Sequence, residues 1–219
     1  MTEFVDILIL GSGFGGSLLG MLLAKSGRRV ALIDRAAHPR FAIGESSTPL
    51  ADTTLAQLAD QYELPQLKSL AKYGSWKREY SDVMCGPKRG FSYFGHSPSA
   101  AFDEDQQLLV AASSSLVLSD THWLRSDIDQ LLFQIAGQAG VLQFENAKYE
   151  LTSSEAGWIV QGVFCDRKFR VDAPFIVDAT GSYNAVLRHL HVADQTEVLK
   201  TNSAAVFAHF RESHPWNEC

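Results

Sequence analysis

Residues 5–16 read VDILILGSGFGG, and this stretch decides the fold. Its first half is a short apolar run, typical of a strand that is buried on both faces of a parallel sheet. Its second half has the pattern G-x-G-x-x-G, with glycines at 11, 13 and 16. The next segment, SLLGMLLAKSG at 17–27, has helical apolar spacing and ends on a glycine, a common helix C-cap. The sequence therefore predicts a strand, a glycine-rich turn and a helix in succession.

A second apolar run, RVALID at 29–34, completes a βαβ unit that ends on Asp34. In such a unit Gly11 permits the tight turn, Gly13 lets the backbone approach a pyrophosphate, and Gly16 lets the helix pack closely. The helix N-terminus offers free N–H groups and a partial positive charge to phosphates. Asp34 can bind ribose hydroxyls and disfavours a 2′-phosphate, which predicts the adenosine of FAD or NAD rather than NADP. The alternative is a tight βα turn in an unrelated α/β protein.

The composition limits the kind of protein. The chain has 219 residues, of which 46% are hydrophobic and 20% charged, enough for one core or for one domain and part of another. A net charge of -6 argues against nucleic acid as the main partner, and no apolar run approaches the roughly 20 residues of a membrane span. Cysteines stand at 85, 165 and 219 without a C-x-x-C motif. We therefore expect a cytoplasmic chain with no metal site.

The rest of the sequence alternates between helical and strand patterns. The expected elements are helices over 50–72, strands and loops of another layer over 74–120, an amphipathic helix over 126–137, a small antiparallel meander over 141–172, a buried strand in PFIVDATGS at 174–182, and a last strand in SAAVFAHF at 203–210. We find no internal repeat and no low-complexity linker.

Three further features favour FAD. They are the segment HPRFAIGESSTP at 38–49, Arg125 just before a predicted helix, and the turn VDATGS at 177–182. With the nucleotide motif, they resemble the glutathione-reductase-type fold of the flavin monooxygenases, and the segment 38–49 is most similar to that of the flavin-dependent halogenases. The resemblance implies an α/β fold, with a Rossmann-like parallel sheet, a small antiparallel meander and an incomplete substrate domain. It places the FAD-binding domain at 1–80 and 108–195, and substrate-domain parts at 81–107 and 196–219.

The same resemblance implies which residues contact FAD. They are Gly11, Gly13, Phe14, Gly15, Gly16, Asp34, Arg35, Ile43, Gly44, Glu45, Ser46, Ser47, Thr48, Arg125, Asp178, Ala179, Thr180 and Gly181. Several have a simpler interpretation. Ser47 or Thr48 can cap the following helix, and Glu45 can be a solvated loop acid. Arg125 can be a surface charge, and Asp178 a structural carboxylate that accepts backbone hydrogen bonds.

Lys72, in the run KYG at 72–74, resembles the catalytic lysine of halogenases that act on phenols and carrier-bound pyrroles. In that family reduced FAD and oxygen convert chloride or bromide to hypohalous acid, which is passed to a lysine beside the substrate. The alternative is a solvated lysine, because Lys68, Lys77 and Lys88 are nearby. His96 is a candidate base. The partners implied are a small substrate, aromatic or carrier-bound, and a separate flavin reductase.

The sequence also departs from the family. The W-x-W-x-I-P signature is absent, and so is the Gly-Asp motif expected further downstream. A complete relative is about twice as long, which suggests an N-terminal portion. The alternatives are therefore a related flavoprotein reductase of the prenyl-reductase type, and a truncated module that binds FAD or ADP without catalysis.

Overall fold

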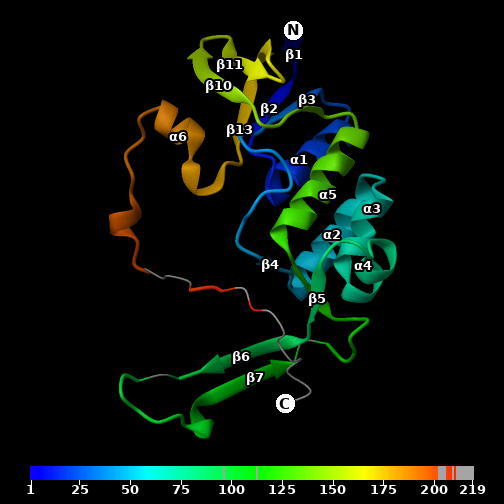
Figure 1. The fold of residues 1–219 in the computed structure, drawn as a ribbon, viewed down its shortest axis with the longest axis vertical. Helices are drawn as coiled ribbons and strands as arrows, with labels where there is room; N and C mark the ends of the chain where they lie inside the picture. Colours follow the sequence, from blue (N-terminus) through cyan, green and yellow to red (C-terminus); the bar gives the residue numbers. More distant parts are fainter. Residues whose placement is uncertain (96, 112, 202–205, 209, 211–219) are drawn as a thin grey trace.

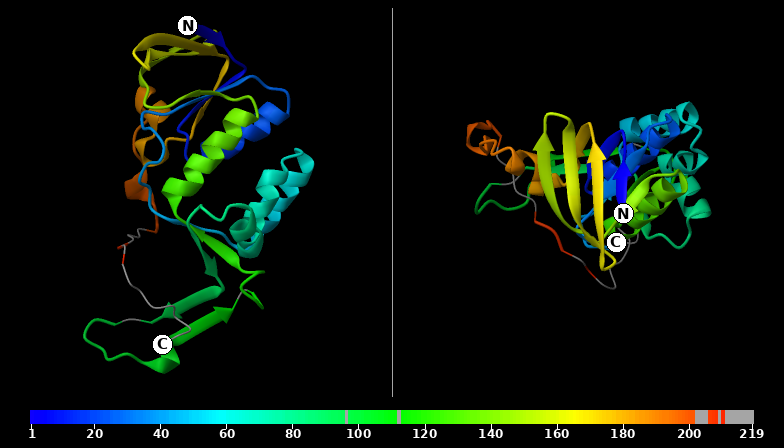
Figure 2. Two further views of the ribbon diagram at one scale, coloured as in Figure 1. Left: turned by 45° about the vertical axis from the view of Figure 1, so that its right-hand side comes forward. Right: turned by 90° about the horizontal axis from the view of Figure 1, so that it is seen from above.

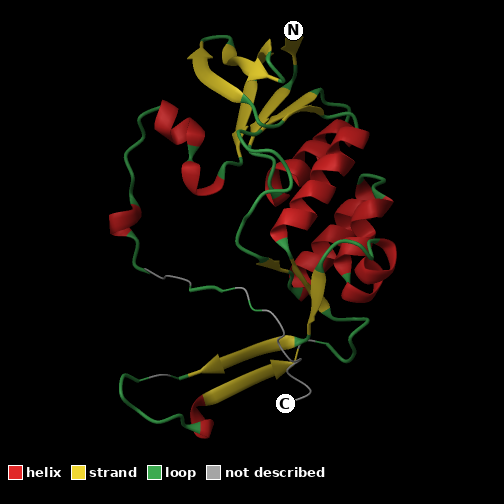
Figure 3. Cartoon of the chain, in the orientation of Figure 1, coloured by secondary structure: helices red, strands yellow, loops and turns green. Residues whose placement is uncertain are grey.

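The computed structural model describes residues 1–95, 97–111, 113–201, 206–208 and 210. A parallel sheet lies between helices on one face and an antiparallel meander on the other (Figures 1 and 2). A two-stranded hairpin projects from the end of the molecule opposite to the meander. Helices, strands and loops are distinguished in Figure 3. The chain therefore has the predicted mixed α/β fold.

The central sheet contains four strands in the order β13-β2-β3-β9, and every neighbouring pair is parallel. These strands are β2 (Ile7–Leu10), β3 (Val30–Ile33), β9 (Leu142–Phe144) and β13 (Phe175–Asp178). Leu10 pairs with Ile33 on one side and with Asp178 on the other, so the strands end at one edge. Gly11, Asp34 and the residue after Asp178 are thereby brought together there.

The two faces of this sheet belong to two apolar clusters. Ile9 and Leu32 pack with the helices, whereas Leu8 and Leu10 pack with the meander. All four side chains are fully buried. Burying one such side chain contributes about 1.5–3 kcal/mol, so the continuous apolar runs of the sequence are explained by burial on both faces.

The meander consists of β10 (Lys148–Ser154), β11 (Gly157–Phe164) and β12 (Arg167–Ala173), and β1 (Thr2–Phe4) adds to β12 in parallel. The predicted meander is confirmed from 148 onward. Its first part was wrong, because β9 belongs to the central sheet, where it pairs with β3. Phe144 on β9 and Phe169 on β12 stack at 4.7 Å within the apolar cluster that joins the two sheets.

Helices α1 (Phe14–Lys25) and α5 (Arg125–Gln138) pack side by side against the sheet (Figure 1). Helices α2 (Pro49–Gln61), α3 (Pro65–Lys68) and α4 (Tyr73–Glu79), with the 3₁₀ turn η1 (Ser69–Ala71), form a smaller layer beyond them. The helical prediction for 50–72 is confirmed. The prediction of strands and loops was wrong for 74–79, which belong to α4; there, fully buried Trp76 packs on Tyr80 at 5.1 Å and on Trp123 at 6.4 Å.

A three-stranded sheet of order β4-β8-β5 joins these helices to the hairpin. Its strands are β4 (Glu45–Ser46), β5 (Cys85–Lys88) and β8 (Asp120–Trp123), and the hairpin pairs β6 (Gly90–Phe94) with β7 (Gln107–Ala111). Short turns η2 (Glu104–Gln106), η3 (Gly181–Tyr183) and η4 (Thr196–Val198) and helix α6 (Ala185–His189) complete the described elements. Half of the strand predicted at 203–210 falls outside the described residues, and residues 206–208 and 210, which are described, are not in a strand. Within the described part of the chain, no helix has the length and apolar content to span a membrane.

The turn between β2 and α1 depends on two glycines. Gly11 has φ +98°, a conformation that side chains rarely adopt. A Cβ on Gly16 would lie 1.9 Å from the carbonyl oxygen of Gly11, so the helix and the turn touch through backbone. Gly15, one residue earlier, would place its Cβ in open space.

We predict that Gly16→Ala destabilises the protein by on the order of 1–3 kcal/mol, because the added methyl group must push the helix away from the turn. Gly15→Ala is the matched control, and it should stabilise the protein by up to about 1 kcal/mol. Urea unfolding of both variants measures the difference. Equal free energies of unfolding for the two variants would show that α1 does not depend on this contact.

Candidate functional site

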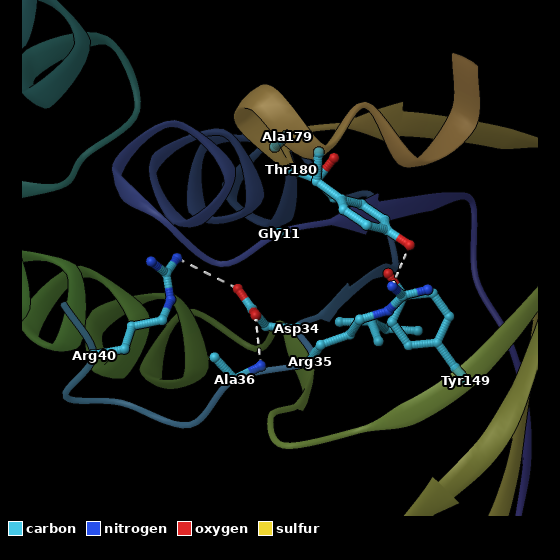
Figure 4. Close-up of a pocket in the computed structure, with 10 residues that line it drawn as sticks. Gly11, Asp34, Arg35, Ala36, Arg40, Tyr149, Ala179 and Thr180 are labelled. Atoms are coloured by element: carbon cyan, nitrogen blue, oxygen red, sulfur yellow. Dashed lines mark hydrogen bonds and ion pairs between the residues drawn. The ribbon is translucent and has the colours of Figure 1, made fainter. Parts of the chain in front are cut away.

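A pocket of about 340 Å³ opens where β2, β3 and β13 end (Figure 4). Hydrogen bonds continue the sheet one residue beyond the strands, since Gly11 N donates to Ile33 O and Ala179 N donates to Leu10 O. The pocket is therefore built on rigid backbone. Its lining includes five of the predicted cofactor residues: Gly11, Asp34, Arg35, Ala179 and Thr180.

Asp34 lies at the bottom of this pocket with its side chain 12% exposed. Its Oδ2 accepts hydrogen bonds of 2.8 Å from both the N–H and the hydroxyl of Ser12, and its Oδ1 accepts one of 2.9 Å from Ala36 N. Burial alone would raise the pKa of Asp34, but the hydrogen bonds from Ala36 and Ser12 lower it below its ordinary value. The fourth donor, Arg40 Nη2, is farther away at 3.4 Å. Arg40 is thus the donor that a ribose hydroxyl can most easily replace.

Arg35 forms one wall of the pocket between two tyrosines. Its guanidinium lies 4.8 Å from the ring centre of Tyr149 and 4.6 Å from that of Tyr183. Figure 4 shows the Arg35 side chain directed toward these rings. Such a planar stack offers a surface for a flat ring. The sequence predicted Arg35 but neither tyrosine, because these come from the meander and from η3.

Two guanidinium groups meet in front of Gly13, the N-cap of α1. A Cβ on Gly13 would lie 3.3 Å from Nη2 of both Arg40 and Arg125. Arg125 bonds to buried Asp129 at 2.7 and 2.9 Å, and Arg40 lies 3.9 Å from the same carboxylate. Asp129 therefore holds two cations at a helix N-terminus, where backbone N–H groups also favour an anion.

Arg125 is not the exposed charge that the simpler interpretation allowed, since its side chain is 19% exposed and ion-paired. Sequence reasoning missed Arg40. Its signal was its place in the segment 38–49, six residues after Asp34.

The segment 43–48 lies on the other side of the α1 N-terminus. Residues Glu45 to Thr48 line a second pocket of about 460 Å³ together with Phe14 and Trp123, whereas Ile43 and Gly44 are exposed and do not line it. Glu45 Oε2 lies 3.8 Å from Arg125 Nη1, and Arg40 lines the first pocket, so each pocket has a residue of, or next to, the guanidinium pair.

Two hydroxyls of this segment have structural roles. Thr48 caps α2, accepting a hydrogen bond of 3.3 Å from Ala51 N, and Pro49 occupies the first turn. Buried Ser47 accepts a hydrogen bond of 2.8 Å from Thr121 N. The simpler interpretation of these hydroxyls is therefore confirmed for Thr48. The Ser46 hydroxyl has neither of these two roles, and Ser46 lines the second pocket.

At the end of β13, the residues 178–181 divide into structural and pocket-lining positions. Asp178 accepts hydrogen bonds from Thr180 N at 3.0 Å and from Val186 N at 2.7 Å, as a structural carboxylate does. Ala179 and Thr180 line the first pocket. Gly181 has φ +62° and begins η3, so its part is to turn the chain.

Lys72 lies apart from both pockets. Its Nζ is 2.8 Å from Asp52 Oδ2 and 3.4 Å from Asp120 Oδ1. It is therefore not a freely solvated lysine, and the two acids were not predicted. His96 lies outside the described residues. No group of three or more His, Cys, Asp or Glu side chains suited to a metal ion occurs in the part of the chain that the structure describes.

His38 is a partly buried polar residue that contacts Ser12, a hydrogen-bond donor to Asp34. Its Nε2 lies 2.8 Å from Ser12 Oγ, its ring packs 4.9 Å from that of Phe133, and its Nδ1 is buried with no partner among the described residues. Burial lowers the pKa of His38, and the charge of Arg40 lowers it further. The ring is thereby favoured in its neutral form.

Known proteins similar to this chain agree with this geometry. The model of the NAD(P)-binding Rossmann-like domain matches residues 9–60. Tetracycline 7-halogenase of Kitasatospora aureofaciens is 30% identical over 211 residues, which are 93% of this chain and 36% of that enzyme. This chain is homologous to flavin-dependent halogenases. The halogenase PrnC of Pseudomonas fluorescens, which acts on monodechloroaminopyrrolnitrin, is 28% identical over 217 residues, or 99% of this chain and 38% of its own.

A solved halogenase extends the comparison to structure. The crystal structure of halogenase PltM with phloroglucinol and FAD superposes with a TM-score of 0.74 at 31% identity, covering 85% of this chain and 36% of that one. The chain thus spans a little over one third of the length of its halogenase relatives. The resemblance inferred from the motifs is confirmed.

We predict that His38→Gln reduces the loss of stability on acidification. Because the pKa of His38 in the folded chain lies below its ordinary value of 6.5, the unfolded chain binds this proton first as the pH falls. Wild type should therefore lose free energy of unfolding from about pH 6.5 downward, and the variant should lose less. Urea unfolding between pH 5 and 8 measures this slope, with the exposed His191→Gln as control for the substitution. Parallel curves for wild type and His38→Gln would contradict the assignment.

Proposed function

We propose that this chain binds FAD and forms the cofactor-binding part of a halogenase-like flavin monooxygenase. When bound, reduced FAD supplies the oxygen-activating chemistry that converts a halide to hypohalous acid or hydroxylates an organic substrate. The observation that carries the proposal is the pair of guanidinium groups in front of Gly13, between two pockets. A dinucleotide has the same order: one ring system, a doubly charged pyrophosphate and a second ring system.

The residues fit the three parts of FAD. Asp34 and Arg35 would hold the adenosine, with the carboxylate toward the ribose and the guanidinium toward the adenine. The pyrophosphate would be held beside Gly13 by Arg40 and Arg125, whose Nη2 atoms lie 3.3 Å from the position that a Cβ on Gly13 would take. The second pocket, lined by residues 45–48 and Phe14, would take the flavin ring. Phosphates held by two arginines and a helix N-terminus are bound by charge-assisted hydrogen bonds.

Ser12 and His38 would keep Asp34 ready for the ribose. Their hydrogen bonds orient the carboxylate and hold it ionised, so that ribose hydroxyls meet an acceptor. Arg40 would move from Asp34 toward the pyrophosphate as the ribose takes its place. The acid at position 34 disfavours a 2′-phosphate, which selects FAD or NAD over NADP.

Lys72 is the residue that we propose beside the substrate. The PltM complex with phloroglucinol supports a small aromatic substrate, and a relative that chlorinates a pyrrole on a peptidyl-carrier protein supports a carrier-bound one. Reduced flavin would come from a separate reductase. We further propose that residues 1–80 and 108–195 form the FAD-binding domain, and that residues 81–107, which contain β6, belong to the substrate domain. The halogenase class is favoured over a prenyl-type reductase because the relatives of 28% identity and above are halogenases.

We predict that Arg40→Ala lowers the affinity for ADP by about 10- to 100-fold, because one charge-assisted contact to the pyrophosphate is lost. Arg29→Ala is the matched control. Arg29 is also ion-paired, at 3.4 Å with Asp6, but its side chain is 67% exposed and lies outside the pocket. Isothermal titration calorimetry with ADP measures both variants. The same affinity for Arg40→Ala and wild type would remove Arg40 from the site.

A further inference from the structure

A buried group of acids lies beneath Lys72. Asp52 is on α2 and Asp120 is on β8, and they are 2% and 1% exposed. Carboxylates are almost never buried to this degree unless they are paired. The pairing residue is Lys72, whose Nζ bonds to both, at 2.8 and 3.4 Å. The side chain of Lys72 remains 38% exposed. The two carboxylates are therefore buried, while the amine of Lys72 is accessible from solvent.

The surroundings of the two acids favour the charged, ammonium form of Lys72. One further oxygen of each acid, Asp52 Oδ1 and Asp120 Oδ2, is buried without a hydrogen-bond partner among the described residues. The other nearby cation, Lys88, pairs in register with Asp120 across the strands, but its Nζ donates at 2.6 Å to the backbone oxygen of Ser47. No ion pair joins Lys88 to either acid within the described residues. Lys72 is thus the cation ion-paired with both acids, and its single positive charge balances one of the two carboxylates.

We propose that Asp52 and Asp120 are positioning residues that hold Lys72 as an ammonium ion, with one N–H left to donate to a bound molecule. An ammonium has three N–H donors, and two of them are used by the acids. The third is available on the exposed side of the residue.

The electrostatics of Lys72 support this assignment. Burial alone would lower the pKa of Lys72, but its hydrogen bonds and charge interactions with Asp52 and Asp120 raise it. The pKa of Asp52 lies above its ordinary value, first because of burial and also because of Asp120, while Lys72 and Ser47 oppose this rise. Removing either acid takes away a partner that stabilises the ammonium.

The consequence of this arrangement for catalysis rests on the proposed function. A neutral amine attacks the halogen of hypohalous acid, whereas an ammonium donates a hydrogen bond to its oxygen. The two acids favour the second role for Lys72, and they fix the place at which the donor stands. The lysine side chain is long and flexible, and the two carboxylates restrict the Nζ of Lys72, at the end of η1, to one position.

The test measures the reactivity of Lys72 toward an acetylating reagent. Such a reagent reacts with a lysine only when its amine is neutral. Wild type, Asp52→Asn and Asp120→Asn are treated with a limiting amount of an N-hydroxysuccinimide ester of acetic acid between pH 6.5 and 10. Mass spectrometry then follows each lysine separately. We expect the pH at which Lys72 becomes reactive to fall in both variants, with its rate at pH 7.5 rising at least five-fold. Near-ultraviolet circular dichroism confirms that the variants fold.

Two controls separate charge from loosened packing. Asp60→Asn removes the exposed partner of Lys68, at 2.7 Å, and should leave the Lys72 profile unchanged. Asp52→Glu keeps the charge and should keep Lys72 slow at pH 7.5. The proposal is overturned if the pH profile of Lys72 acetylation is the same in wild type and both Asn variants. It is also overturned if the acetylation rate of Lys72 in the variants rises by the same factor at every pH. The assay contains no flavin, halide or substrate, so its failure is distinct from a failure of FAD binding.

Discussion

The contact between backbone atoms at Gly11 and Gly16 is the constraint on which the site depends. It brings the N-terminus of α1 to the edge where β2, β3 and β13 end. Asp34, at the end of β3, and Ala179, after β13, then stand on either side of the turn. A larger residue at Gly16 would move the helix, and with it the N–H groups of its first turn, relative to the arginines that meet in front of Gly13. The βαβ unit is therefore a frame that sets the places of all other groups.

The local parts of this frame could be predicted from sequence. The strand at 5–10, the glycine-rich turn and the acid at 34 are close together along the chain, so their patterns are read directly. Arg40, Tyr149 and Tyr183 could not be found in this way, because they reach the pocket from separate elements. The same holds for the acids beneath Lys72, which lie 20 and 48 residues from it in sequence.

The wrong predictions have a common physical cause. The region 74–120 was predicted as strands and loops from its glycine, aromatic and serine residues, yet residues 74–79 belong to α4 because Trp76 enters the core beside Tyr80 and Trp123. The segment at 142–144 has strand alternation, but its partner is decided by Phe144, which lies between the sheets. In both cases a buried aromatic side chain determined the element and its place, and tertiary packing overrode the local pattern.

The central claim is that one chain binds both ends of a flavin dinucleotide, on either side of the α1 N-terminus. Titration of the protein with FAD, ADP and FMN in parallel tests it most directly, with flavin fluorescence for FAD and FMN and calorimetry for ADP. The account predicts that FAD binds at least ten-fold more tightly than either half, because both pockets and the guanidinium pair are engaged together. Equal affinities for FAD and ADP would contradict it, since the second pocket would then contribute nothing.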